Sequence, residues 1–97
     1  MIETLCQAIS EKRILKFTYD GLPRTVEPHL VGDRTTGKTG LSAYQIGGQS
    51  HSNAVPYWRP FTVSKIRGLE VTDQTFDEPR PGYNPNDSRM TVIHCRI

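Results

Sequence analysis

The sequence predicts a mainly β fold, a small and strongly bent antiparallel barrel with one N-terminal capping helix. Apolar residues recur at helical spacing only near the start of the chain, within residues 1–13. From residue 14 onward the pattern changes to the two-residue alternation of half-buried strands. Five short strands with close turns are expected over residues 14–72, and this arrangement is typical of a small barrel.

The predicted helix carries its apolar side chains on one face. The basic residues Lys12 and Arg13 follow this stripe, where the helix dipole favours positive charge. A helix this short is marginal in water by itself, so we expect the stripe to pack on the barrel. The stripe consists of Ile2, Leu5, Cys6 and Ile9.

The first two strands are expected to form a hairpin. Residues 14–19 alternate between apolar and polar side chains, and Asp20-Gly21 is a favoured hairpin turn, which Leu22-Pro23 would widen. The return strand is expected over about residues 24–31, with a bend or a sheet edge at Pro28, because proline lacks an amide donor. The later strands are expected over residues 41–46, 57–63 and 67–72.

The C-terminal part of the chain has a different character. Prolines, a glycine and several Asn/Asp residues make residues 73–89 a loop-rich arm, with Phe76 and Tyr83 as its candidate anchors. Alternation returns over residues 90–97 and predicts a terminal strand. The length suits a single domain over residues 1–97.

Composition and charge exclude several classes of protein. A net charge of +2 and a pI near 8.7 are too mild to indicate nucleic-acid binding by themselves. No apolar run approaches the ~20 residues of a membrane span, and no signal peptide is visible, so we expect a soluble, cytoplasmic protein without membrane contact. Cys6 and Cys95 lack metal-ligand spacing and fall in apolar patterns, so we expect buried free thiols rather than a disulfide.

Three segments carry a family-like pattern at compatible spacing. They are Arg24-Thr25-Val26-Glu27-Pro28-His29-Leu30-Val31, then Leu41-Ser42-Ala43-Tyr44, then the segment from Tyr57 through Arg59 and Phe61 to Lys65-Ile66. Together they resemble the WYL domain of prokaryotic regulators. Thr39-Gly40 replaces the Trp-Tyr pair that names this family, which would leave the family's ligand site wider, shifted or lost. The resemblance implies a Sm-like, Src-homology-3-type barrel.

The resemblance also implies a binding site. In the family pattern, basic residues at the positions of Arg59 and Lys65 project into a pocket for anionic, often nucleic-acid-derived ligands. A guanidinium gives a phosphate two parallel hydrogen bonds, and an ammonium adds a point charge. Arg24, His29 and Tyr44 are expected around them, although Arg24 and His29 differ in parity and a straight strand would place them on opposite faces. The structural alternatives are a position at the barrel rim for Arg59, a solvated turn for Lys65 and a surface charge for Arg24. For His29 and Tyr44 the alternatives are structural and packing roles.

The expected function is a non-enzymatic ligand-sensing or regulatory module for a nucleotide-type or oligonucleotide-type anion, without metal or cofactor. No serine elbow, carboxylate pair or glycine-rich phosphate loop argues for an enzyme. Expected partners are a separate DNA-binding or effector protein, or further copies of the chain. One alternative is a protein–protein assembly module that uses strand edges. Another is a direct single-stranded nucleic-acid binder that uses Arg24, Arg59, Lys65, Arg67 and Trp58.

Overall fold

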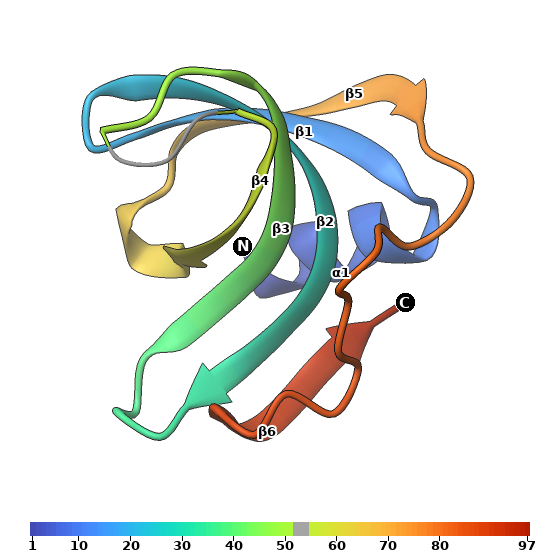
Figure 1. The fold of residues 1–97 in the computed structure, drawn as a ribbon. Coiled ribbons are helices and arrows are strands. Elements are labelled where there is room, and N and C mark those ends of the chain that lie inside the picture. The colour runs from blue at the N-terminus through green and yellow to red at the C-terminus, as the bar shows by residue number, and fades with distance from the viewer. Residues whose placement is uncertain (52–54) are drawn as a thin grey trace.

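The structure is a computed structural model, and it describes residues 1–51 and 55–97. The strands curl into a strongly bent sheet, and the N-terminal helix lies beneath its arch (Figure 1). The elements are α1 (Ile2–Ser10), β1 (Arg13–Tyr19), β2 (Leu22–Arg34), β3 (Thr39–Gly48), β4 (Tyr57–Thr62), the short 3-10 helix η1 (Val63–Lys65), β5 (Arg67–Thr75) and β6 (Met90–Arg96).

The strands form one antiparallel sheet in the order β4-β3-β2-β1-β5. β2 is its central strand: β3 covers one edge along most of its length, while β1 and β6 share the other edge. The end strands β4 and β5 do not pair with each other in the described part of the chain. The predicted mainly β fold with one N-terminal helix is therefore confirmed, but the sheet is not closed.

The β1–β2 hairpin confirms the predicted turn and corrects its length. Asp20 and Gly21 both have positive φ angles, 52° and 74°, as a type I′ turn requires. Tyr19 pairs directly with Leu22. The loop therefore consists of Asp20 and Gly21 alone, and Leu22-Pro23 begins the next strand instead of widening the turn.

The central strand β2 can contain a proline because its neighbouring strand on one edge changes at this point. β1 pairs with β2 up to Val26 and β6 pairs with it from Leu30, so Pro28 lies in the gap between them. On the other edge, the register with β3 shifts between Pro28 and Leu30, which makes His29 the extra residue of a β-bulge. The bulge reverses the alternation, so Val26 and Val31 share the core although they are an odd number of positions apart.

The core lies between α1 and the concave face of the sheet. Leu5, Ala8 and Ile9 are the buried residues of α1. They join a cluster in which the rings of Phe17 and Phe61 meet edge to face, with their centroids 5.0 Å apart. The predicted apolar stripe is therefore confirmed as the core-facing side of the helix. No helix within the described ranges has the length and apolar character needed to cross a membrane.

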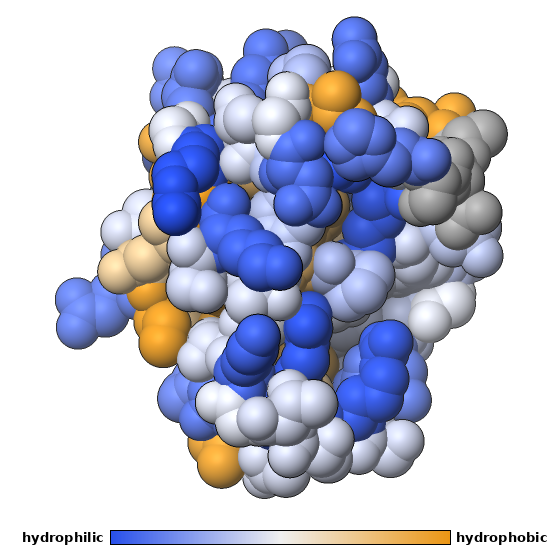
Figure 2. All heavy atoms as spheres, turned by 90° about the vertical axis from the view of Figure 1, so that its left-hand side faces the viewer, coloured by the Kyte–Doolittle hydropathy of each residue, from blue (hydrophilic) through white to orange (hydrophobic). Residues whose placement is uncertain are grey.

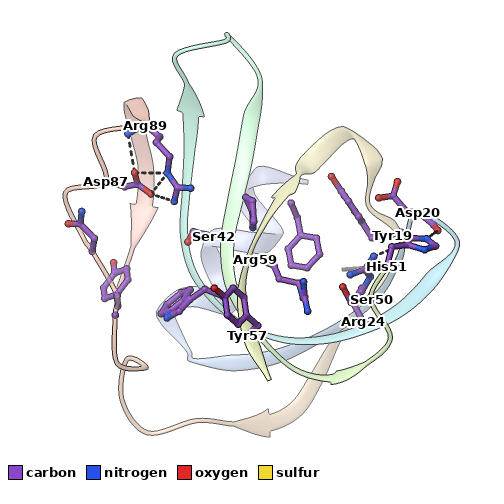
Figure 3. A pocket seen from close by; sticks show the side chains of 16 residues that line it. Tyr19, Asp20, Arg24, Ser42, Ser50, His51, Tyr57, Arg59, Asp87 and Arg89 are labelled. Carbon is purple, nitrogen blue, oxygen red and sulfur yellow. Dashed lines mark hydrogen bonds and ion pairs between the residues drawn. The ribbon is translucent and has the colours of Figure 1, made fainter. Parts of the chain in front are cut away.

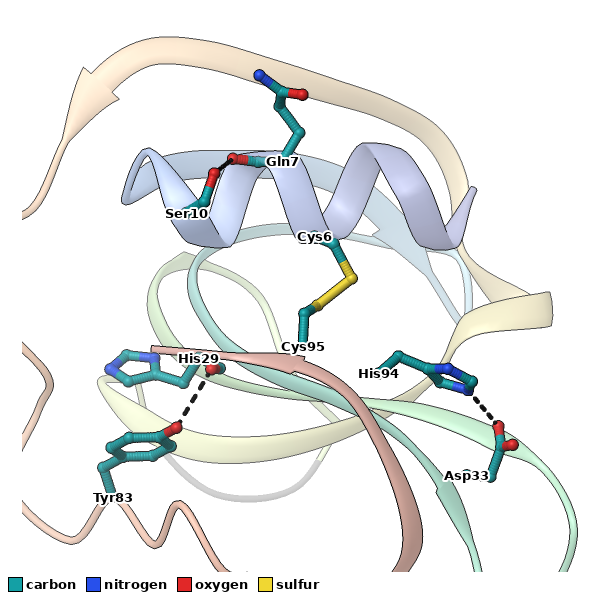
Figure 4. The surroundings of a disulfide bond; sticks show 8 residues. All are labelled: Cys6, Gln7, Ser10, His29, Asp33, Tyr83, His94 and Cys95. Carbon is teal, nitrogen blue, oxygen red and sulfur yellow. Dashed lines mark hydrogen bonds and ion pairs between the residues drawn. A yellow bond between two sulfur atoms is a disulfide. The ribbon is translucent and has the colours of Figure 1, made fainter.

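The prediction of two free thiols is wrong. Cys6 on α1 and Cys95 on β6 form a disulfide, with their Cα atoms 5.6 Å apart (Figure 4). Both residues lie at the margin of the core and are only partly buried. Because β6 returns to the free part of the β2 edge, it brings the end of the chain over α1. The spacing of the cysteines along the sequence does not reveal this contact.

Residues 76–89, here called the arm, pack on the outer face of the sheet, the face directed away from the core. Phe76 is buried and Tyr83 is half-buried, so both predicted anchors are confirmed. Trp58 Nε1 donates a hydrogen bond to the Pro81 carbonyl oxygen at 2.8 Å. The rings of Trp58 and Tyr83 are stacked, with centroids 6.2 Å apart. These contacts hold the arm beside β4.

Candidate functional site

A pocket of about 590 Å³ opens along the edge strand β4. One wall comes from the core side of the sheet and includes Arg24 and Arg59, and the opposite wall comes from the arm and includes Asp87 and Arg89. In Figure 3, β4 passes between these two groups of side chains. Figure 2 shows this side of the molecule as mainly hydrophilic and hollowed. The pocket therefore joins the β1–β2 turn, β4 and the arm.

Arg24 is the buried cation of the first wall, with 5% of its surface exposed. Its Nη1 donates to Gln45 Oε1 at 3.3 Å, and its Nη2 donates to the Tyr19 carbonyl oxygen at 3.1 Å. Both acceptors are uncharged, and Nε has no hydrogen-bond partner among the described residues. A buried charge is costly without an opposite charge. Arg24 is therefore a buried cation whose hydrogen-bond acceptors carry no charge, which favours the binding of an anion beside it.

Gln45 sets the orientation of Arg24. The side chain of Gln45 is fully buried, and its Nε2 donates to the carbonyl oxygens of Gly47 at 2.9 Å and Gln49 at 3.0 Å. Because both amide hydrogens are used there, Oε1 faces the guanidinium. A glutamine thus holds Arg24 in place without neutralising it, whereas a glutamate would cancel the charge.

Arg59 reaches the same pocket from β4. Only 7% of its surface is exposed, and its guanidinium lies 5.8 Å from the centre of the Tyr57 ring. Burial lowers the pKa of Arg24, and the positive charge of Arg59 lowers this pKa further, while Asp20 acts in the opposite direction. A bound anion would relieve the repulsion between the two guanidinium groups.

The structure separates the five residues predicted to form the site. Arg24 and Arg59 line the pocket together, whereas Lys65 is exposed in η1 and lies outside it. His29 and Tyr44 lie on the outer face of the sheet, against Trp58, and do not line the pocket. Arg24 and His29 are therefore on opposite faces, as their parity predicts.

His29 belongs to an aromatic cluster beneath the arm. Its fully buried ring contacts Trp58 and Phe76, with centroid distances of 4.7 and 5.4 Å. Nε2 accepts a hydrogen bond from the Arg80 amide at 3.1 Å, and Nδ1 lies 2.8 Å from the Glu27 carbonyl oxygen. These contacts fit a neutral ring with its proton on Nδ1. Burial lowers the pKa of His29, which favours the same neutral form.

Glu27 and Arg80 form the ion pair that fastens the arm. Arg80 Nε donates to Glu27 Oε1 at 2.6 Å, and Arg80 Nη2 donates to Glu27 Oε2 at 3.0 Å, a bidentate arrangement. The same guanidinium lies 4.9 Å from the centre of the Tyr44 ring. Glu27 and Tyr44 are neighbours across β2 and β3. Tyr44 thus helps to hold the arm on the outer face, and it does not itself line the pocket.

Sequence reasoning missed Gln45 and the arm residues of the pocket. Gln45 had a detectable signal, because it shares parity with the apolar residues Leu41 and Ala43 on a predicted strand. A polar side chain at a core position calls for buried partners. Asp87 and Arg89 had no such signal, since they lie in a loop-rich segment whose path over β4 is set by packing.

The arrangement offers an anion two buried guanidinium groups and an exposed ring. Tyr57 is 50% exposed beside Arg59 and can contact the flat part of a ligand. Within residues 1–51 and 55–97, no group of His, Cys, Asp and Glu side chains could hold a metal ion. No protein-family model, no curated protein and no solved structure matches the chain.

Proposed function

We propose that the chain is a non-enzymatic, regulatory binding module that holds an anionic ligand of the nucleotide or short oligonucleotide type around Arg24 and Arg59. The observation that carries this proposal is the state of Arg24, whose guanidinium is buried in a pocket with uncharged acceptors. Phosphate oxygens would supply the missing negative charge and accept hydrogen bonds from both arginines.

The WYL resemblance is part of the proposal. Its support is that Arg24 and Arg59, which match the family pattern in separate segments, line one pocket. The bent antiparallel sheet with its N-terminal helix is compatible with an open form of a Sm-like barrel. As a sensor, the module would pass ligand binding on to a DNA-binding or effector protein.

Isothermal titration calorimetry tests the proposal with inorganic phosphate, thymidine 5′-monophosphate and a short thymidine oligonucleotide. Arg24→Gln and Arg59→Gln should each weaken binding of the two nucleotide probes about 10- to 150-fold, which corresponds to ~1.5–3 kcal/mol for a charge-assisted contact. Lys65→Gln removes the same charge outside the pocket and is the matched control, with an expected change below about twofold. Melting curves verify that each variant is folded.

Two results would overturn this function. One is that the wild type binds none of the probes. The other is that Lys65→Gln weakens binding as much as Arg24→Gln, which would indicate a diffuse attraction to the whole surface. Repeating the titrations at two salt concentrations separates these modes, because a backbone binder loses affinity steeply as salt rises.

The assembly alternative depends on the strand edges at the ends of the sheet. β4 is poorly suited to pair with another chain, because Pro60 lacks an amide donor and the Thr62 amide already donates to the Tyr19 hydroxyl at 2.9 Å. β5 pairs with β1 on one edge and is the better candidate. Analytical ultracentrifugation decides: mass that increases with protein concentration, together with no response to anions, would favour assembly.

A further inference from the structure

We propose a second cationic subsite, formed by Arg34 beside Gly40, which makes the preferred ligand an extended polyanion with two separated phosphate groups. This inference rests on the proposed function, since Arg24 and Arg59 would hold the first phosphate.

Arg34 fills the space above Gly40 on the neighbouring strand. A Cβ atom at Gly40 would lie 2.4 Å from Arg34 Nε and 2.7 Å from Arg34 Nη2, so the guanidinium occupies the place of a side chain. Nη1 reaches Thr62 Oγ1 at 3.4 Å, and Nη2 has no hydrogen-bond partner in the described part of the chain. Glycine at position 40 thus permits a cation at this point of the sheet.

The Arg34 site adjoins the larger pocket. Arg34 lines a second cavity of about 180 Å³. Ser42, Pro60 and Arg89 line both cavities, so the two meet on the outer side of β4. A linear ligand that passes around the edge strand β4 can therefore contact both the Arg24–Arg59 pair and Arg34. A compact ligand with one phosphate group fills only the first position.

Two cations, Arg34 and Arg89, line the second cavity, and Arg34 is the one that can attract an anion. Arg89 is already paired, because its Nη2 lies 2.6 Å from Asp87 Oδ2. The pKa of Asp87 is lowered, first by its hydrogen bond to Arg89 and also by the charge of Arg34, so this carboxylate attracts Arg34 without forming an ion pair with it. Arg34 itself forms no ion pair within hydrogen-bonding distance among the described residues. A phosphate group in this cavity would gain a charge-assisted contact with Arg34.

Calorimetric titration of thymidine 5′-monophosphate and the 5′-phosphorylated thymidine dinucleotide tests the subsite. The wild type should bind the dinucleotide at least about tenfold more tightly than the mononucleotide, which corresponds to ~1.4 kcal/mol. Arg34→Gln removes the charge and retains a polar side chain, so it should abolish this advantage while changing mononucleotide affinity less than about twofold. Arg67→Gln, an exposed arginine on β5, is the matched control and should preserve both affinities.

Gly40→Ala provides an independent variant that keeps the charge. Its Cβ would displace the Arg34 guanidinium, so it should show the same selective loss for the dinucleotide. If Arg34→Gln does not fold, this variant alone decides. Titration with inorganic tripolyphosphate identifies the source of the anion. If Arg34→Gln also weakens tripolyphosphate binding, the result supports a polyphosphate ligand. If it weakens only dinucleotide binding, the result supports a nucleic-acid strand.

The failure of the subsite differs from the failure of the proposed function. If Arg24→Gln weakens mononucleotide binding but neither Arg34→Gln nor Gly40→Ala affects the dinucleotide, only the subsite is overturned. Equal losses for both nucleotides in Arg34→Gln would also overturn it, because they would indicate a general effect of charge. If no probe binds the wild type, both proposals are overturned.

Discussion

Protonation of His29 should make the protein sensitive to mild acid. The ring is fully buried, and its Nε2 accepts a hydrogen bond from the Arg80 amide, an interaction that a protonated ring cannot make. Glu27 and Arg80 are the charged groups facing it, and Trp58, Phe76 and Tyr83 enclose it. Burial lowers the pKa of the folded form below its ordinary value of 6.5. The unfolded chain therefore binds this proton more readily than the folded chain.

The sign and size of the effect follow from this difference. Above the unfolded pKa both states are neutral at His29, so the residue adds no pH dependence. As the pH falls below about 6.5, the unfolded state gains the proton first, and the free energy of unfolding decreases by at most ~1.4 kcal/mol per pH unit. The decrease ends when the folded state also takes up the proton. Between pH 7.5 and 5.5, His29 should therefore lower stability by up to ~1.4 kcal/mol.

Urea unfolding at pH 7.5, 6.5 and 5.5 measures this decrease, with fluorescence of the single tryptophan, Trp58, as the signal. His29→Gln should be less stable at pH 7.5 but should lose most of the pH dependence. His51→Gln replaces an exposed histidine and should retain the wild-type dependence. A wild type whose stability stays constant from pH 7.5 to 5.5, or a His29→Gln variant with an unchanged slope, would refute the reasoning.

Three further variants test the disulfide, the core and a glycine with positive φ at the end of β3. The double variant Cys6→Ser/Cys95→Ser removes a cross-link between residues 89 positions apart. The chain-entropy estimate for this loop is ~4.6 kcal/mol and losses of ~2–4 kcal/mol are typical, so the melting temperature should fall and reductant should not lower it further. Phe17→Ala should cost ~3–5 kcal/mol in urea unfolding, because the side chain is 4% exposed in the core; an effect below ~1 kcal/mol would contradict its placement. Gly48→Ala should cost more than ~1 kcal/mol, because its φ is 84° and its Cβ would lie 2.2 Å from a backbone oxygen. Gly47→Ala, where the nearest contact is 3.4 Å, is the matched control and should be milder in the same melting assay.

The local sequence determined most of the secondary structure. The alternation around Phe17 and the Asp20-Gly21 turn suffice to predict the first hairpin, because strand faces and turn angles depend on residues close together in the chain. The helical stripe likewise identifies the face of α1 that is buried. The opposite orientations of Arg24 and His29 also follow from parity.

Tertiary structure decided which of these residues meet. The bulge at His29 changes the parity of β2, and the return of β6 to the β2 edge joins Cys6 to Cys95. The pairing order β4-β3-β2 brings Arg59 to Arg24, and the path of the arm adds the second wall of their pocket. Contacts of this kind join segments far apart in the chain. Their energies depend on the packing of the whole sheet, which no short stretch of sequence contains.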